Sequence, residues 1–433
     1  MFSSTKYLSA LSIVVALLGT GCSGGQSAEN PTDTCEELPI DEGSILRTPD
    51  AFTAVIGQVV GEELYPVLGS DNKWHIVYEL MLTNGRPIPA SIHEIKVLDY
   101  YDNERVLRSI TETEIIELSV NLSGRPRLEP QTPSLMDGDA FLQPNESMVV
   151  FIELAFDSID DVPDAVVHQF SGSAATNPGS SYPQDVAYLM VPQAINKEPL
   201  PLVGAPLQGE NWVVINGCCS PAGAHRGSIQ TISGRLRVAQ RFAIDWMKIG
   251  DNGMFFEGDP ANVENWHNYG EPVLAVADGT VIEVLDELDD QSPGSLPDPS
   301  SITIETVDGN HVILDIGGGT YVFYAHLKRG SVSVAKGDNV RQGEVIGELG
   351  NSGNTSAPHL HIHYSNSPSA LAADGIPYRY REFTATGRVE PEQWESTTAD
   401  LDEVWNILPP LKDMPAGDFM PLDLDVGSFS ASP

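Results

Sequence analysis

The stretch Asn354-Thr355-Ser356-Ala357-Pro358-His359-Leu360-His361-Ile362-His363-Tyr364 determines how the second half of this chain is interpreted. Successive side chains of a β-strand point to opposite faces, so the spacing predicts a strand with imidazoles on one face and apolar side chains on the other. The imidazoles belong to His359, His361 and His363, and the apolar side chains to Leu360, Ile362 and Tyr364. Imidazole nitrogens bind zinc, and a histidine without metal can still transfer protons near neutral pH. Three of the chain's 10 histidines fall within these few residues. This clustering favours a metal site over a strand face that is rich in histidine by chance.

Length and charge restrict the class of protein. A chain of 433 residues with 41% hydrophobic content predicts two domains of ordinary size, each with its own core. The 61 acidic residues against 23 Lys and Arg give a formal charge of -38. Such a chain repels phosphate backbones, so the composition predicts no nucleic-acid partner.

The first residues have the pattern of an export signal. Lys6 precedes an apolar run from Leu8 to Leu18 that is too short to span a bilayer, and Gly19-Thr20-Gly21-Cys22 follows. We expect a signal peptide over residues 1–21 and a flexible polar tether over residues 22–45. Small residues before Cys22 resemble a bacterial lipobox. This predicts a lipid-anchored protein of the cell envelope, on the periplasmic side of the outer membrane. A plain cleaved signal, with Cys22 incidental, is the alternative.

Export implies an oxidising compartment in which cysteines pair. Cys35 could pair with one of the adjacent Cys218 and Cys219, those two could bond to each other, or all three could stay free. Two neighbouring cysteines can also bind zinc. The sequence leaves these alternatives open.

Residues 46–200 contain short β-strand patterns between turn signals. Lys73–Leu82 is followed by Thr83-Asn84-Gly85, and Ser147–Leu154 follows Pro144-Asn145-Glu146. Repeated strands without a helical period predict an immunoglobulin-like β-sandwich. Its histidines, His75, His93 and His168, share no motif and predict no chemistry.

A second β-rich domain is expected over residues 205–385. Residues 270–281 and 336–347 are two glycine-punctuated units that predict hairpins of a small barrel. The segment Asp286–Ser301, rich in Pro, Asp and Ser, predicts an exposed loop. Residues 386–433 are expected to form an acidic tail without activity of its own.

Three other stretches of this domain carry residues that could join the histidine strand. His326 follows the apolar run Tyr321-Val322-Phe323, so it would lie at a strand end. Residues 241–246 alternate in polarity, which would place Arg241 and Asp245 on one strand face. His225 lies in Ala224-His225-Arg226. Each residue alone has an ordinary structural explanation, and only their order together is specific.

That order resembles the lysostaphin-type zinc endopeptidases, which cut peptidoglycan peptides. The resemblance covers about residues 245–364. The motifs that carry it are Phe242-Ala243-Ile244-Asp245, Gly270-Glu271-Pro272-Val273-Leu274-Ala275, Ala277-Asp278-Gly279, Tyr324-Ala325-His326-Leu327, Gly337-Asp338-Asn339-Val340, Gly350-Asn351-Ser352-Gly353-Asn354 and Pro358-His359-Leu360-His361. It implies an antiparallel β peptidase domain with Asp245 and His361 as zinc ligands. It also implies that His326 and His359 are the catalytic pair and that His363 supports the ligands.

The chain departs from the family at one ligand. The family's first ligand, a histidine, stands four residues before the aspartate, where this chain has Arg241. Ile229–Val238 predicts a hairpin turning near Ser233-Gly234, which would place His225 opposite residue 241 or 242. Facing residues of an antiparallel pair share a face with Cβ atoms about 5 Å apart, so His225 could replace the missing imidazole. A slip of one residue would turn it to the wrong face.

His267 is the reserve candidate for the missing ligand, whereas His311 is expected to pack within a strand.

The resulting hypothesis is a zinc endopeptidase of the cell envelope. His225, Asp245 and His361 would bind Zn²⁺ and leave a position for water, whose pKa the metal lowers to about 7. His326 and His359 would move the proton and stabilise the oxyanion. The resemblance implies peptidoglycan stem peptides or cross-bridges as substrates, without indicating which bond is cut. The alternative is a metal-free relative that binds peptidoglycan or activates another hydrolase through an envelope protein partner.

Overall fold

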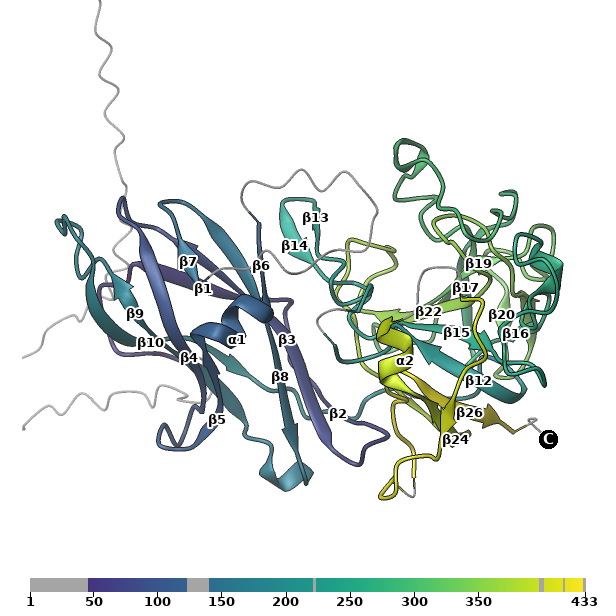
Figure 1. The fold of residues 1–433 in the computed structure, drawn as a ribbon, viewed down its shortest axis with the longest axis horizontal. Coiled ribbons are helices and arrows are strands. Elements are labelled where there is room, and N and C mark those ends of the chain that lie inside the picture. Colours follow the sequence, from purple (N-terminus) through teal and green to yellow (C-terminus); the bar gives the residue numbers. More distant parts are fainter. Residues whose placement is uncertain (1–45, 123–139, 221–222, 397–400, 416, 431–433) are drawn as a thin grey trace, which may run out of the picture. The chain divides into compact units, whose positions relative to one another are not determined.

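The computed structural model describes residues 46–122, 140–220, 223–396, 401–415 and 417–430. The proposed signal peptide, the tether, Cys22 and Cys35 lie outside these residues. The described chain is mainly β, as the sequence predicts, and most of its strands pair antiparallel in three large sheets (Figure 1). Among the described residues, no helix has both the length and the apolar character needed to cross a bilayer.

Two five-stranded sheets form the N-terminal sandwich. The first contains β1 (Val55–Val60), β2 (Pro66–Leu68), β3 (Trp74–Asn84), β8 (Ser147–Phe156) and β6 (Ser119–Asn121). The second contains β10 (Gln184–Ala194), β9 (Ala165–Ala174), β4 (Ala90–Asp99), β5 (Val106–Thr111) and β7 (Phe141–Leu142). The short helix α1 (Glu112–Glu117) connects β5 to β6.

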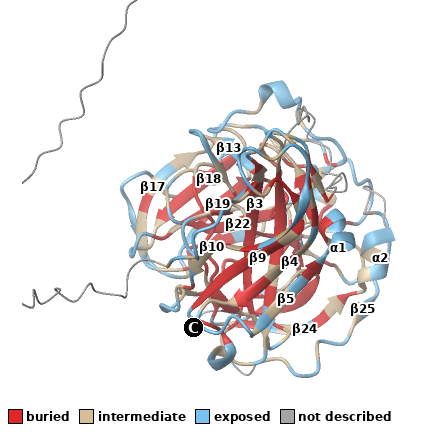
Figure 2. Ribbon diagram, turned by 90° about the vertical axis from the view of Figure 1, so that its left-hand side faces the viewer, coloured by how far each residue is buried: buried red, intermediate tan, exposed pale blue. Residues whose placement is uncertain are grey.

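Alternation along β3 divides its side chains between two environments. Ile76, Tyr78, Leu80 and Leu82 enter the core that both five-stranded sheets share, and Figure 2 shows β3, β4 and β9 largely buried. The residues between them point to the outer face of the first sheet, which is also buried. Glu79, on this outer face, is fully buried.

The outer face of the first sheet packs against residues that follow the sandwich in the sequence. Met81, Val149 and Phe151 share a small apolar cluster with Ile229 and Val238. The latter two residues flank the hairpin of β13 (Gln230–Ile232) and β14 (Arg235–Arg237). The sandwich therefore contacts the segment that connects β12 to β15, which becomes important for the candidate site.

The ten-stranded sheet carries the candidate site. Its order is β20 (Asn339–Val340), β17 (Gly279–Leu285), β18 (Asn310–Asp315), β19 (Tyr321–Leu327), β22 (Leu360–Ser365), β15 (Ile244–Lys248), β12 (Gly209–Ile215), β26 (Asp425–Phe429), β24 (Phe383–Val389) and β25 (Ile407–Leu408). All of its strand pairs are antiparallel. The strand predicted from the histidine spacing is β22, which lies between β15 and β19.

The two glycine-punctuated units pair with each other. β16 (Pro272–Leu274) pairs with β21 (Val345–Glu348), and β17 pairs with β20. The prediction of two separate hairpins is therefore wrong. Each unit contains short strands separated by turns, and each strand pairs with a strand of the other unit, while β17 also pairs with β18.

Residues 386–433, expected as a tail, instead supply strands to the ten-stranded sheet. β26 lies between β12 and β24, and its Val426 and Phe429 are buried. Helix α2 (Pro391–Ser396) lies between β24 and β25 and outside the sheet. This segment is acidic overall, but it contains the five-residue strand β26. Apolar side chains of this strand belong to two separate hydrophobic clusters.

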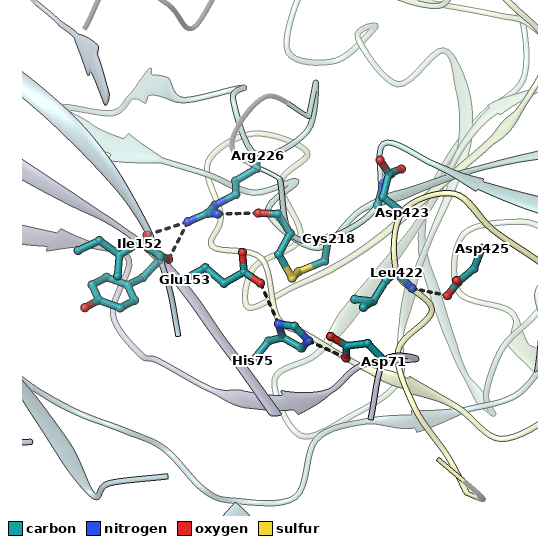
Figure 3. The surroundings of a disulfide bond; sticks show 12 residues. Asp71, His75, Ile152, Glu153, Cys218, Arg226, Leu422, Asp423 and Asp425 are labelled. Carbon is teal, nitrogen blue, oxygen red and sulfur yellow. Dashed lines mark hydrogen bonds and ion pairs between the residues drawn. A yellow bond between two sulfur atoms is a disulfide. The ribbon is translucent and has the colours of Figure 1, made fainter. Parts of the chain in front are cut away.

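A disulfide bond joins Cys218 to Cys219, the second of the three arrangements that the sequence leaves open (Figure 3). It follows β12 and lies close to the outer face of the first sheet. His75, Glu153 and Cys219 offer atoms within 4.8 Å of one another, but the disulfide occupies the sulfur. This cluster is therefore not a metal site in the oxidised protein.

His75 is held by two carboxylates. Its Nδ1 lies 2.9 Å from Glu153 Oε1 and its Nε2 lies 3.0 Å from Asp71 Oδ1 (Figure 3). Burial lowers the pKa of His75, but the hydrogen bonds to Asp71 and Glu153 outweigh it and raise the pKa from 6.5 to about 9. A folded-state pKa above the unfolded value stabilises the fold at low pH, and this contribution is lost as the pH rises through about 9.

We therefore predict that the contribution of His75 to the free energy of unfolding decreases as the pH rises from 6.5 to 9.5. The contribution at low pH is up to about 3 kcal/mol, since one pKa unit corresponds to about 1.4 kcal/mol. His75→Gln should be less stable than the parent at pH 6 and nearly equal to it at pH 9.5. Urea unfolding midpoints measured across this range check the prediction, and parallel curves for the two proteins would contradict it.

Candidate metal centre

Pairing of β15 with β22 brings two candidate ligands together. The register places Asp245 opposite His361, so the two side chains share one sheet face. Asp245 Oδ1 lies 2.9 Å from His361 Nδ1. The other face of β22 carries Leu360, Ile362 and Tyr364 into the main apolar core, which confirms the predicted division of this strand.

His225 reaches the same place by a route that differs from the predicted one. The hairpin ladder covers only residues 230–237 and pairs Gln230 with Arg237, a register that would set residue 225 opposite residue 242 if it continued. The chain leaves the ladder before that point, and His225 lies in a turn. Its Nε2 lies 3.2 Å from Asp245 Oδ1 and 3.1 Å from His361 Nδ1.

Arg241 points away from this cluster. The residue lies in the turn before β15, not on the strand as expected, and its guanidinium forms an ion pair with Glu79, 2.7 Å away. A cation therefore does not stand beside the candidate ligands. Where the family has its first ligand, this protein has Arg241, whose side chain contacts the sandwich instead.

His326 owes its orientation to an irregularity in β19. Ala325 pairs with His361, so regular alternation would turn His326 to the opposite face. The β18–β19 register shifts next to this point, and His326 adopts a positive φ of 62°. Such bulges re-aim side chains at sites. The His326 ring centroid lies 4.7 Å from that of His359.

His359 precedes β22 and is held by the loop before it. Its Nδ1 lies 2.7 Å from the Ala357 carbonyl oxygen and 3.3 Å from Thr355 Oγ1. Because a carbonyl oxygen only accepts, Nδ1 carries a proton and Nε2 is the nitrogen that faces the candidate site. That Nε2 lies 3.2 Å from Asp245 Oδ1. By the same argument, His326 Nδ1 donates to the Ser352 carbonyl oxygen over 2.8 Å.

His363 supports His361 from behind. Its Nδ1 lies 2.9 Å from His361 Nε2, and its ring stacks on Phe323 with centroids 4.3 Å apart. His361 is thus fixed on one nitrogen and directs the other toward Asp245. Histidines that bind metals are commonly oriented in this way through their second nitrogen.

Sequence reasoning missed Asn216. Its Nδ2 donates to Asp245 Oδ2 over 2.8 Å, and its carbonyl oxygen lies 2.9 Å from His225 Nδ1. Asn216 therefore fixes two candidate ligands at once. The residue directly follows β12 and has a positive φ of 56°, which asparagine tolerates better than most residues. An asparagine directly after an apolar strand run was the one available signal.

The pKa shifts follow from burial and from the close approach of these groups. Burial raises the pKa of Asp245, but His225 and His359 outweigh it and hold the pKa well below its usual value. Burial alone would lower the pKa of His225. The negative charge of Asp245 outweighs this effect, so the pKa of His225 is raised. Burial, with His359 and His361 nearby, holds the pKa of His326 well below normal, so that ring is neutral at pH 7.

The donor set fits a divalent cation. His225 Nδ1 faces two carbonyl oxygens, from Asn216 at 2.9 Å and Ala243 at 3.2 Å, so it carries a proton, and Nε2 is the atom that can bind metal once it releases its own proton. His225, Asp245 and His361 are only 6%, 7% and 3% exposed, and their ligand atoms lie within 4.8 Å of one another. Two imidazoles and one carboxylate form a ligand set typical of catalytic zinc.

A second set of three overlaps with the first. His326, His359 and His361 also bring their ligand atoms within 4.8 Å of one another, and His361 belongs to both sets. The reserve candidate His267 lies elsewhere, with its Nε2 3.2 Å from Asn252 Oδ1. His311 lies in β18 with its Nδ1 2.9 Å from the Gly309 carbonyl oxygen. Neither belongs to either set.

Comparison with known proteins relates part of this chain to a protein family. Residues 265–372 match peptidase family M23. This part of the chain is an M23 peptidase domain. The M23 match contains His326, His359 and His361, whereas His225 and Asp245 lie before it.

The chain is also similar to characterised proteins. Glycyl-glycine endopeptidase ALE-1 of Staphylococcus capitis is 26% identical over 188 residues, covering 39% of this chain and 45% of that protein. The chain thus spans less than half the length of this curated relative. The lysostaphin catalytic domain from Staphylococcus simulans is 23% identical, covering 32% of this chain and 78% of that one, with a TM-score of 0.19. A zinc-containing peptidase from Vibrio cholerae is 15% identical, covering 56% of this chain and 87% of that one, with a TM-score of 0.17.

Proposed function

We propose that this protein is a zinc-dependent endopeptidase that hydrolyses peptide bonds in the stem peptides or cross-bridges of peptidoglycan. One observation carries the proposal: His225 Nε2, Asp245 Oδ1 and His361 Nδ1 converge in a buried cluster. The M23 match supports the peptidase class, and the matched region supplies His361.

We assign the metal to His225, Asp245 and His361 because this set contains a carboxylate. A buried dication is stabilised by a negative ligand, which three imidazoles do not offer. Asn216 and His363 also orient members of this set, as outer partners of metal ligands do. His326 and His359 then remain free to act on the substrate.

His326 and His359 are arranged to move a proton. Each directs Nδ1 to a backbone carbonyl oxygen, from Ser352 and Ala357, so each has Nε2 available for the reaction. A neutral imidazole can take a proton from water and return one to the leaving amine. Protonated, it can also stabilise the oxyanion that develops on the scissile carbonyl. Zinc, when bound, would contribute Lewis acidity at the same place.

The name of the Staphylococcus capitis relative suggests the first substrate to test. Glycine cross-bridges come first, because that relative is a glycyl-glycine endopeptidase. Stem peptides containing D-amino acids come second, since the chain's own residues do not select between the two. We also propose an exported protein, lipidated at Cys22 and held at a bacterial membrane. The polar segment after Cys22 would let the enzyme reach the cell wall.

Metal content and cleavage test the proposal together. The full chain is expressed in a bacterium grown with zinc and purified from the envelope fraction. We expect about one zinc per chain and release of peptides from purified sacculi that stops with a chelator and returns with zinc. Protein without zinc and without cleavage would support the metal-free scaffold instead. Recovery from the cytoplasm would contradict the proposed localisation.

A further inference from the structure

His225 and its neighbour Arg226 point in opposite directions. The imidazole faces Asp245 and His361. The guanidinium instead donates to backbone carbonyl oxygens of the sandwich's first sheet, one of them from Ile152 (Figure 3). Both side chains are buried, at 6% and 3% exposure. A single peptide unit therefore joins the candidate metal centre to the sandwich.

Arg226 is fixed by four hydrogen bonds. Its Nε donates to Glu79 Oε1 over 3.0 Å, and its Nη1 donates to the Cys219 carbonyl oxygen over 2.6 Å. Its Nη2 donates to the carbonyl oxygens of Tyr78 and Ile152, 3.0 and 2.8 Å away. Three of the four acceptors belong to β3 and β8 of the sandwich. The planar guanidinium thus has one orientation, which a flexible ammonium would not keep.

Glu79 also holds the chain on the other side of the site. Its Oε2 accepts from Arg241 Nε over 2.8 Å, and Arg241 Nη2 donates to the Val60 carbonyl oxygen over 3.0 Å. Burial raises the pKa of Glu79, but Arg241 and Arg226 outweigh it and lower the pKa, so the carboxylate is charged. One carboxylate of the sandwich therefore fixes both the turn of His225 and the turn that enters β15, four residues before Asp245.

The segment around His225 lies outside regular secondary structure. Among its described residues, positions 216–220 and 223–229 belong to no strand or helix. The His225 ring contacts two backbone carbonyl oxygens, but these do not fix the chain on the far side of the residue. Functional side chains keep their geometry only when their supporting residues are themselves fixed. The four bonds of Arg226 provide the directional part of that support, beside the apolar packing of Ile229.

We propose that the sandwich is a positioning element for the metal centre, with Glu79 and Arg226 as positioning residues that set the place of His225. Arg241 is, in this proposal, part of the same support. The proposal rests on the zinc site described above. Stability alone does not explain the charged group, because a buried ion pair can often be replaced by apolar residues without loss of stability. A charged, directional contact instead fixes one geometry.

Arg226→Lys tests this in the full chain. Lysine keeps the charge beside Glu79 but cannot donate to four acceptors in a planar arrangement. We expect the zinc Kd to rise about 10- to 100-fold, the range seen when outer partners of metal ligands are lost. We also expect an altered visible spectrum of the Co²⁺-substituted protein, since a displaced imidazole changes the ligand field. Glu79→Asp, which shortens the carboxylate by one methylene, is a second variant with the same expected direction.

Ile95→Ala is the matched control. Ile95 is fully buried in the sandwich core, on the sheet that does not contact Arg226. Its loss should lower the melting temperature while zinc affinity and the Co²⁺ spectrum stay unchanged. Either folded variant, Arg226→Lys or Glu79→Asp, with parental zinc affinity and spectrum would overturn the proposal. If neither variant folds while Ile95→Ala does, the contact is required for folding and the positioning role is likewise rejected. If the parent protein itself binds no zinc, the proposed function fails instead.

Discussion

His225→Ala is expected to lose zinc and peptidoglycan hydrolysis together. Losing an outer partner of a metal ligand costs about 10- to 100-fold in affinity, so losing a ligand should cost more than that. The remaining donors, Asp245 and His361, would hold the ion by two atoms only. We expect less than a tenth of the parental zinc content after dialysis and no peptide release above background. Metal analysis and a sacculus digestion assay measure both.

His267→Ala is the control for that experiment. His267 is the other histidine that the sequence offers as a substitute ligand, and the structure places it beside Asn252 instead. It should keep zinc and activity. If His225→Ala keeps one zinc per chain, the ion belongs to the overlapping set of His326, His359 and His361, and the assignment of His225 is wrong.

The local part of this site could be predicted from the sequence. Alternation along residues 359–364 places imidazoles and apolar side chains on opposite faces, because a strand's period of two is set by its backbone. The same rule, applied to two strands, brings Asp245 beside His361 once they pair. Strand periodicity and the order of motifs are therefore enough to predict that Asp245 and His361 lie side by side.

Positions outside regular strands were harder to predict. The hairpin argument predicts that His225 lies near Asp245, and its Nε2 does lie 3.2 Å from Asp245 Oδ1, but the ladder ends at Gln230 and Arg237 and does not set this position. His326 faces His359 only because of a bulge and a positive φ, which no sequence period signals. Turns and bulges depend on which groups they meet across the fold, and these contacts are not local in sequence.

Arg241 illustrates a contact that only tertiary structure reveals. In the sequence, a cation at a ligand position suggests a lost metal site. In the structure, its partner is Glu79, which lies more than 160 residues earlier. The reason for the arginine therefore lies in the packing of the sandwich against the segment that carries His225. A departure from a family motif can thus mark a new contact instead of a lost activity.

His359→Gln is expected to keep zinc and to lose cleavage. In the proposed mechanism His359 offers its Nε2 to the reaction, and removal of a group that transfers protons lowers rates by about 10²- to 10⁴-fold. We expect that loss in kcat, with KM for a glycine peptide nearly unchanged, because the side chain acts mainly in the transition state. Steady-state kinetics and metal analysis of the same sample separate the two effects.

The choice of glutamine makes this experiment informative. Glutamine keeps a polar, uncharged side chain of similar length, but its amide does not accept a proton near neutral pH, so the substitution removes proton transfer without adding a charge. His93→Gln, at an exposed site in the sandwich, controls for the substitution itself. Loss of zinc from His359→Gln would show that His359 is a ligand and that its role and that of His361 were exchanged. Zinc retained with full activity would leave His326 as the proton-transferring group, because its neutral ring is the nearest one to His359.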